Sequence, residues 1–168
     1  MVSRLGWALK SWILAALAIA LSAVPALPAT VTDTFQVSIT IQADCTISTA
    51  LSDINFGTEG VLDTDVAASS TLSCTCSSGT PYTIGLNEGT GTGATVAVRK
   101  MTNGGSTVDY SLYTDSGHTT VWGNVSGEWV SANGTGLPQL FTIYGLVPTQ
   151  TTPAAGTYTD TITVTVTF

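Results

Sequence analysis

Apolar and polar residues alternate in short runs along most of this chain, with Gly, Pro, Asn and Asp between the runs. Successive side chains of a β-strand point to opposite faces, so a period of two predicts half-buried strands. No stretch has a convincing helical period. The pattern predicts an all-β sandwich or barrel. The expected strands are 34–43, 66–76, 82–87, 94–101, 108–114, 140–146 and 159–168, with turns at 89–93, 103–105, 116–117, 133–136 and 151–156.

The first and last expected strands differ from an ordinary sandwich strand. The first places Phe35, Val37, Ile39 and Ile41 on one face. It becomes the start of the chain once the segment before it, described next, is removed, and a chain end is usually poorly ordered unless something ties it down. It is either the first strand of the sandwich or a strand meant for another molecule. The last strand runs to the end of the chain and leaves an edge that must be covered. Its apolar face consists of Ile162, Val164, Val166 and Phe168.

The first 29 residues have the layout of a secretory signal peptide. Arg4 and Lys10 form a basic head, an apolar run covers 12–24, and small residues follow that suit cleavage after Ala26 or Ala29. The apolar run is shorter than the roughly 20 residues of a membrane-spanning helix. We therefore expect an exported chain that is not inserted in a membrane once the signal is removed.

Composition narrows the partners. The chain has 168 residues and a net charge of -7, and without the signal peptide it keeps 11 acidic residues against two basic ones, a net charge of -9. Nucleic acid is excluded as a partner, because neutralising phosphates needs clustered Lys and Arg. With 43% hydrophobic and 9% charged residues, the chain is also unlike a disordered one.

Candidate chemistry is sparse. His118 is the one histidine, and although Asp115 is near it in sequence, no Gly-x-Ser-x-Gly nucleophile motif occurs. A zinc site needs three or four His or Cys ligands, and the spacing of Asp63 and Asp65 does not continue as a calcium loop. The glycine-rich run 89–93 has the character of a hairpin tip. We expect no catalytic site, no metal and no cofactor, so a secreted enzyme is disfavoured.

The three cysteines all lie in the exported part, where disulfides persist. Cys74 and Cys76 are two residues apart, so on a strand they share a face. One of them can pair with Cys45, and closing a loop of this length is worth roughly 3–4 kcal/mol. The third thiol is left over.

Eight short motifs follow one another along nearly the whole exported chain. They are ADC at 43–45, INFG at 54–57, LSCTCSSGTPY at 72–82, RKM at 99–101, YSLYTD at 110–115, WG at 122–123, IYGLVP at 143–148 and GTYTD at 156–160. With these motifs the chain resembles the spore coat protein U domain family, which includes the pilin subunits of archaic chaperone–usher pili.

The resemblance implies an immunoglobulin-like sandwich over 44–168 that lacks its final strand. A periplasmic chaperone would donate a strand to the resulting groove, next to the C-terminal strand. At the outer-membrane usher the N-terminal donor strand of the next subunit, here 30–43, would replace it. The family disulfide would join Cys45 and Cys76, with Cys74 as an extra or alternative cysteine.

The expected function is that of a structural subunit of a surface pilus, formed by donor-strand exchange between identical or related subunits. A head-to-tail contact that does not close gives a filament. The fibre would pass through the periplasm to the surface of a Gram-negative bacterium and serve attachment or biofilm formation. The alternative is a soluble or tip-located adhesive protein of the same fold, although a tip subunit would usually carry a further receptor domain.

Overall fold

The computed structural model describes residues 27–48 and 53–168, and these contain eight strands and no helix. The chain divides into two units, Met1–Ile39 and Thr40–Phe168, and all the strands lie in the second. The strands are β1 (Cys45–Ile47), β2 (Val66–Cys76), β3 (Pro81–Leu86), β4 (Arg99–Asn103), β5 (Ser106–Tyr113), β6 (Val130–Asn133), β7 (Gln139–Val147) and β8 (Val164–Thr167). The all-β prediction is confirmed.

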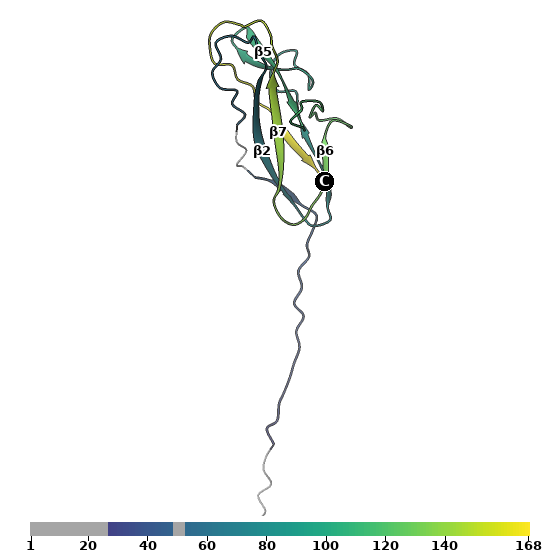
Figure 1. The fold of residues 1–168 in the computed structure, drawn as a ribbon. Helices are drawn as coiled ribbons and strands as arrows, with labels where there is room; N and C mark the ends of the chain where they lie inside the picture. The colour runs from purple at the N-terminus through teal and green to yellow at the C-terminus, as the bar shows by residue number, and fades with distance from the viewer. Residues whose placement is uncertain (1–26, 49–52) are drawn as a thin grey trace, which may run out of the picture. The chain divides into compact units, whose positions relative to one another are not determined.

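Two antiparallel sheets make up the domain. The larger has five strands in the order β1-β2-β7-β5-β4, and the smaller has three in the order β6-β3-β8. The longest pairing joins β2 to β7 from Val66↔Val147 to Cys74↔Gln139, and these two strands run side by side through the domain in Figure 1.

The core lies between the two sheets. Leu72 of β2 and Leu112 of β5 face inward from the five-stranded sheet, and Ile84 of β3 faces them from the other. Trp122 is also buried and donates a hydrogen bond from its Nε1 to the Ile84 carbonyl, at 2.9 Å. Burying apolar side chains of this size contributes about 1.5–3 kcal/mol each.

A buried arginine fixes the connection between β3 and β4. Arg99 has no exposed surface, and burial lowers the pKa of its guanidinium. Its nitrogens donate hydrogen bonds to four backbone carbonyls, those of Leu86, Asn87, Val96 and Trp122. A buried cation is tolerable when its donors are satisfied in this way. Arg99 therefore holds the end of β3 against the segment that precedes β4.

The strand predictions hold best in the centre of the sheets. The expected strand 66–76 is β2 to the residue, and β3, β5 and β7 lie within one or two residues of their expected bounds. The expected strand 94–101 is wrong in its first half, because Thr95 and Val98 exchange backbone hydrogen bonds of 2.9 and 3.1 Å in a turn. The short strands β1 and β6 were not expected.

The two ends of the expected strand set also differ. Residues 34–43 belong to no sheet, since no strand among the described residues pairs with them, and a strand needs a neighbour to bond its backbone groups. The last strand is shorter than expected, Val164–Thr167. The expected signal peptide lies outside the described residues up to position 26. Within the part of the chain that the structure describes, no helix has the length and apolar character needed to cross a membrane.

Candidate functional site

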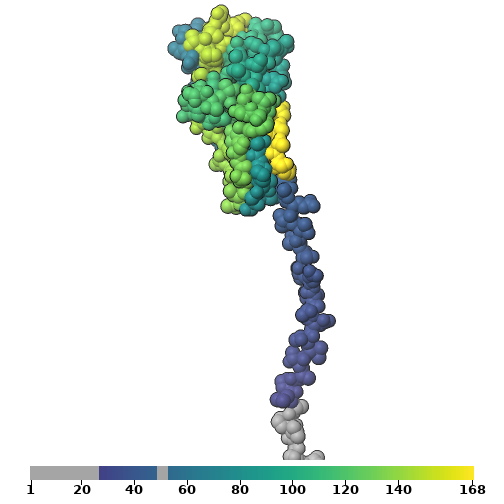
Figure 2. Space-filling view, turned by 90° about the vertical axis from the view of Figure 1, so that its right-hand side faces the viewer, coloured from purple at the N-terminus to yellow at the C-terminus, as the bar shows by residue number. Residues whose placement is uncertain are grey.

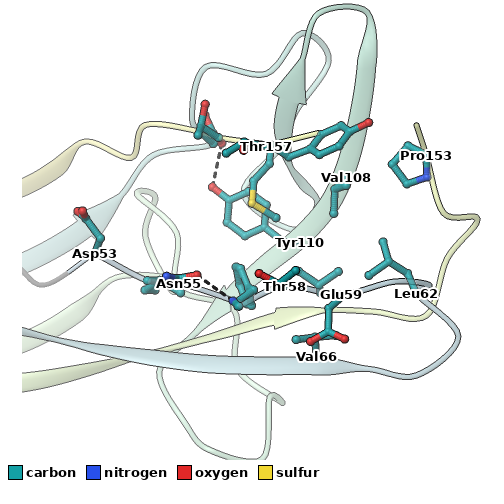
Figure 3. A pocket seen from close by; sticks show the side chains of 18 of the residues that line it. Asp53, Asn55, Thr58, Glu59, Leu62, Val66, Val108, Tyr110, Pro153 and Thr157 are labelled. Atoms are coloured by element: carbon teal, nitrogen blue, oxygen red, sulfur yellow. Dashed lines mark hydrogen bonds between the residues drawn. The ribbon is translucent and has the colours of Figure 1, made fainter. Parts of the chain in front are cut away.

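A cavity of about 1100 Å³ opens along one side of the domain, between residues 53–60 and residues 152–164. Its floor is the inner face of the five-stranded sheet, including Leu112 and Ile143. Figure 3 shows Val108 and Tyr110 between Thr58 on one side of the opening and Thr157 on the other. The cavity is slightly larger than small-molecule pockets, which typically measure about 300–1,000 Å³.

The first wall is a segment, residues 53–60, that pairs with no strand in the described part of the chain. A Cβ atom added at Gly145 of β7 would lie 2.8 Å from Cζ of Phe56 and 3.3 Å from Cγ2 of Ile54, so these two side chains pack on the inner face of β7. The Phe56 ring meets the Tyr110 ring edge-on, with centroids 6.1 Å apart. The segment around Phe56 therefore lies opposite the five-stranded sheet, in the layer of the smaller sheet.

The second wall is the stretch that leads into β8, and Asp160 fixes it. The Asp160 carboxylate accepts hydrogen bonds from the backbone nitrogen and the hydroxyl of Thr90, at 2.7 and 2.8 Å, and from the Tyr110 hydroxyl, at 2.8 Å. Burial, and then the hydrogen bond to Asp160, raise the pKa of Tyr110, so this phenol stays protonated and remains the donor. One carboxylate thus joins the wall to the floor.

Further backbone bonds hold this wall on both sides of Asp160. Thr159 and Thr102 exchange hydrogen bonds of 2.8 and 3.2 Å between their backbone atoms. The Thr163 nitrogen donates to Oδ1 of Asn87, at 2.8 Å, and the Thr163 carbonyl accepts from the Asn87 nitrogen, at 3.1 Å. The wall is therefore pre-formed in the domain.

Strand β8 is hydrogen-bonded on one edge. It pairs with β3 from Thr83↔Thr167 to Leu86↔Val164 and is the last strand of its sheet, so its other edge has no strand partner among the described residues. In Figure 2 the C-terminal segment, coloured yellow, runs along the margin of the domain. Ile162 and Val164 both line the cavity, so the chain at the start of β8 lies at its border.

The smaller layer therefore consists of β6, β3 and β8, then the cavity, then residues 53–58. The cavity takes the place of one more strand in that layer. A strand lying there would meet the backbone edge of β8 on one side and an apolar floor beneath it. The site can bind an extended chain by main-chain hydrogen bonds and alternate side-chain contacts.

The four expected groove residues do not all line the cavity. Ile162 and Val164 line the cavity, while Val166 packs half-buried against the core. Phe168 is 56% exposed and lines a second hollow, together with Tyr82 and Trp129.

The sequence analysis did not predict that the first wall and Tyr110 belong to the site. Residues 54–57 and Tyr110 occur in two of the eight family motifs, so the sequence held a signal without a role attached to it.

The four expected donor residues are exposed. Three of them lie in the unit Met1–Ile39, and Ile41 lies in the second unit. Phe35, Val37 and Ile39 expose 88, 82 and 84% of their surface, and Ile41 exposes 75%. Contiguous exposure of large apolar side chains in a soluble protein usually marks an interaction site. The structure thus leaves the alternating apolar face of this segment without cover among the described residues.

The disulfide joins Cys45 of β1 to Cys76 of β2, the pairing that the family resemblance implies. The two residues are direct partners in the β1–β2 register. Ser77, the residue after Cys76, donates from its backbone nitrogen to the Asp44 carbonyl, at 2.9 Å. Cys74 is a free, buried thiol. Together these contacts fix the point where the N-terminal segment enters the domain.

The Asp115 and His118 side chains, which were considered for catalysis, each contact other groups. The Asp115 carboxylate accepts hydrogen bonds from the backbone nitrogens of Thr119 and Thr120, at 3.2 and 2.8 Å, and those bonds lower its pKa. The His118 ring instead meets the Tyr113 ring edge-on, at 5.3 Å. Among the described residues there is no group of three or more His, Cys, Asp or Glu side chains that could hold a metal ion.

The two packed sheets define an immunoglobulin-like β-sandwich. The family model of the spore coat protein U domain matches residues 31–165, and the chain belongs to that family. A solved structure is similar with a TM-score of 0.57 and 26% identity: the complex of the chaperone CsuC with the tip adhesion subunit CsuE, a pre-assembly complex from the archaic chaperone–usher Csu pili of Acinetobacter baumannii. The match covers 77% of this chain and 41% of the chain in that structure. No curated protein matches.

Proposed function

We propose that this protein is a structural subunit of a surface pilus of the chaperone–usher type and that its groove accepts a β-strand from another chain. One observation carries the proposal: the cavity lies between residues 53–60 and β8, and the second edge of β8 has no strand partner among the described residues. Strand addition at such an edge gains main-chain hydrogen bonds and fills alternate pockets with side chains.

The N-terminal segment of the next subunit is the occupant in the fibre. Phe35, Val37, Ile39 and Ile41 alternate with polar residues, so an extended segment 30–43 points all four toward one face. Their exposure means that each can contribute about 1.5–3 kcal/mol on burial, before ordering costs. Because donor and groove are at different places on each subunit, the contact repeats head to tail and builds a filament.

Before assembly a periplasmic chaperone fills the groove, and an outer-membrane usher exchanges the chaperone strand for the donor segment. The similar structure supports this order, because it is a pre-assembly complex of a chaperone with a pilus subunit. The chain enters the periplasm with residues 1–29 as signal peptide and reaches the surface of a Gram-negative bacterium. There the fibre serves attachment or biofilm formation, with a structural rather than an enzymatic role.

A tip-located adhesive subunit is the second candidate, since the pilus protein in the similar structure is a tip adhesion subunit. The exposed apolar face of residues 35–41 favours the shaft. A subunit at the tip has no neighbour ahead of it whose groove its own N-terminal segment could fill.

The substitution Ile39→Asp tests the donor role. A buried carboxylate in the middle of the donor strand would oppose insertion, so we expect purified subunits to stop forming fibres. Binding of the chaperone should persist, because the chaperone occupies the groove and not the donor segment. Electron microscopy measures fibre growth, and co-purification measures the chaperone complex.

The matched control is Ser38→Asp, which adds the same charge on the opposite face of the segment. Fibres of normal length from this control are expected. If Ile39→Asp also gives normal fibres, the segment is not the donor strand.

A further inference from the structure

The three cysteines form one cluster at the junction of β1 and β2. Cys45 lies opposite Cys76 and Ile47 lies opposite Cys74 in the register of these strands. Cys74 is fully buried and its Sγ is 3.7 Å from Sγ of Cys76, which is bonded to Cys45. A free thiol therefore contacts a disulfide inside the domain.

The alternative disulfide, between Cys45 and Cys74, does not fit the present register. Those residues are diagonal partners, and diagonal partners of an antiparallel pair are about 7–8 Å apart. A disulfide rarely spans more than about 7 Å between Cα atoms. Directly opposite residues are close enough, as Cys45 and Cys76 show. Joining Cys45 to Cys74 thus requires β1 to move two residues along β2.

A movement of two residues keeps every side chain on its own face, because the side-chain period of a strand is two. Ala43 would come opposite Cys76, and Ile47 would come opposite Leu72, a buried apolar residue. The sequence therefore supplies apolar residues at each inward position of the shifted strand.

The backbone also suits the shifted register. The Ser77 hydroxyl lies 3.1 Å from the Gln42 carbonyl and 3.4 Å from the Asp44 carbonyl. Asp44 faces Ser77 in the present register and Gln42 would face it in the shifted one, so the hydroxyl already contacts both carbonyls. In addition, β1 has only three residues and lies at the edge of the five-stranded sheet. Few ladder bonds must break for it to move.

We propose that the three cysteines hold β1 in two alternative registers, one with the Cys45–Cys76 disulfide and one with a Cys45–Cys74 disulfide. The second register draws Ala43 and Asp44 into the strand and shortens the free N-terminal segment by about 7 Å. With the proposed function as its premise, the disulfide then sets the reach of the donor strand. The Cys45–Cys76 form has the longer reach.

Exchange between the two forms needs no external oxidant. The Cys74 thiolate attacks Sγ of Cys76, the sulfur 3.7 Å away, and the Cys45–Cys76 bond breaks with its electron pair on Sγ of Cys45. The Cys45 thiolate, now free to move with β1, then attacks Sγ of Cys74, and the Cys74–Cys76 bond breaks. The electron pair leaves on Sγ of Cys76, which takes up the proton that Cys74 gave up. Burial raises the pKa of the Cys74 thiol, so exchange should be slow at neutral pH and faster in alkaline solution.

Thiol mapping of the full exported chain tests the proposal. The oxidised protein is held at pH 9 or refolded in a glutathione redox buffer, and the free thiol is then alkylated. Fragmentation in a mass spectrometer between positions 74 and 76 locates the label. We expect label on Cys74 and a second population with label on Cys76. Cys74→Ser is the matched control and should carry no label.

The variant Cys76→Ser isolates the shifted register. We expect this variant to form a Cys45–Cys74 disulfide. In the shifted register Gln42 takes the place opposite Ser77 that Asp44 has now, so hydrogen exchange at the Gln42 amide should become slower. Label confined to Cys74 after refolding, with a Cys76→Ser variant that leaves both thiols free, would overturn the proposal. Neither measurement involves a fibre, so this failure is distinct from failure of the donor role.

Discussion

Strands β2 and β8 have the same kind of sequence and different surroundings. Both alternate apolar and polar residues, and both direct their apolar residues to the core. Strand β2 has neighbours on both edges, β1 and β7, whereas β8 pairs with β3 and with no other strand that the structure describes. On β2, Leu72 and Cys74 are fully buried, while Val164 and Val166 of β8 are only half-buried.

The difference shows what an alternating pattern encodes. It specifies which face of a strand is apolar, and it does not specify how many neighbours the strand has. The residues of β8 suit deeper burial than this domain gives them. An additional strand would supply both the missing burial and partners for the open backbone edge.

The largest effect is expected from Leu72→Ala, on the strand that has neighbours on both edges. Leu72 has no exposed surface, and leucine-to-alanine changes in cores lower the free energy of unfolding by about 2–5 kcal/mol. The same loss is expected with and without an added peptide of residues 30–43, because Leu72 is buried in either case. Urea denaturation in both conditions measures it.

Val164→Ala should behave differently. In the domain alone we expect a loss below about 1 kcal/mol, because the side chain is half-buried, and a loss of about 1–2 kcal/mol when the peptide is bound. Urea denaturation of the same samples gives both values. An equal loss in the two conditions would mean that the peptide does not cover β8.

Gly145→Ala disturbs the first wall of the groove. The added Cβ would lie 2.8 Å from Cζ of Phe56, so the aromatic ring must shift, and overpacking of this kind costs about 1–3 kcal/mol. We expect weaker binding of the 30–43 peptide in calorimetry. The control Gly105→Ala meets no atom within 4 Å and should bind as the parent does. Unchanged affinity in Gly145→Ala would remove residues 53–58 from the site.

The smallest effect concerns acid stability. Asp65 accepts hydrogen bonds from the nitrogen and hydroxyl of Thr149, at 2.8 and 3.0 Å, and these bonds hold its pKa below the usual value. A carboxyl with a lowered pKa stabilises the fold above about pH 4, and this contribution is lost as the pH falls through the folded-state pKa.

The variant Asp65→Asn should therefore melt at a slightly lower temperature than the parent at pH 7. The difference should shrink toward pH 2, as followed by circular dichroism. A difference that stays constant over this range would exclude the carboxylate as its source.

Much of the sandwich could be predicted from the sequence, because apolar and polar residues alternate clearly in strands that are buried on one face. Strand β2 is the best case, with apolar or small residues at each inward position. The first wall could not be found in this way. Ile54 and Phe56 belong to a segment with no ladder, and only the tertiary contact of Phe56 with Gly145 shows where it lies. The link from Asp160 to Tyr110 joins residues 50 positions apart and is equally invisible to a local pattern.

The cysteines illustrate the same limit. Their spacing predicts that Cys74 and Cys76 share a face, and both side chains are indeed buried on the inner face of β2. Register decides which of them meets Cys45, and register depends on the pairing of β1 with β2. The pairing came from the family resemblance and not from the spacing.

The most direct test of the account compares two versions of the domain in thermal melts. Both begin at Asp44; one ends at Phe168, and the other continues through a short flexible linker into a copy of residues 33–42. We predict that both versions melt cooperatively, and that only the extended one is monomeric and melts at high temperature, because the added strand fills the groove beside β8. Equal folding and equal melting temperature of the shorter version would contradict the account, since the domain would then be complete without a donor strand.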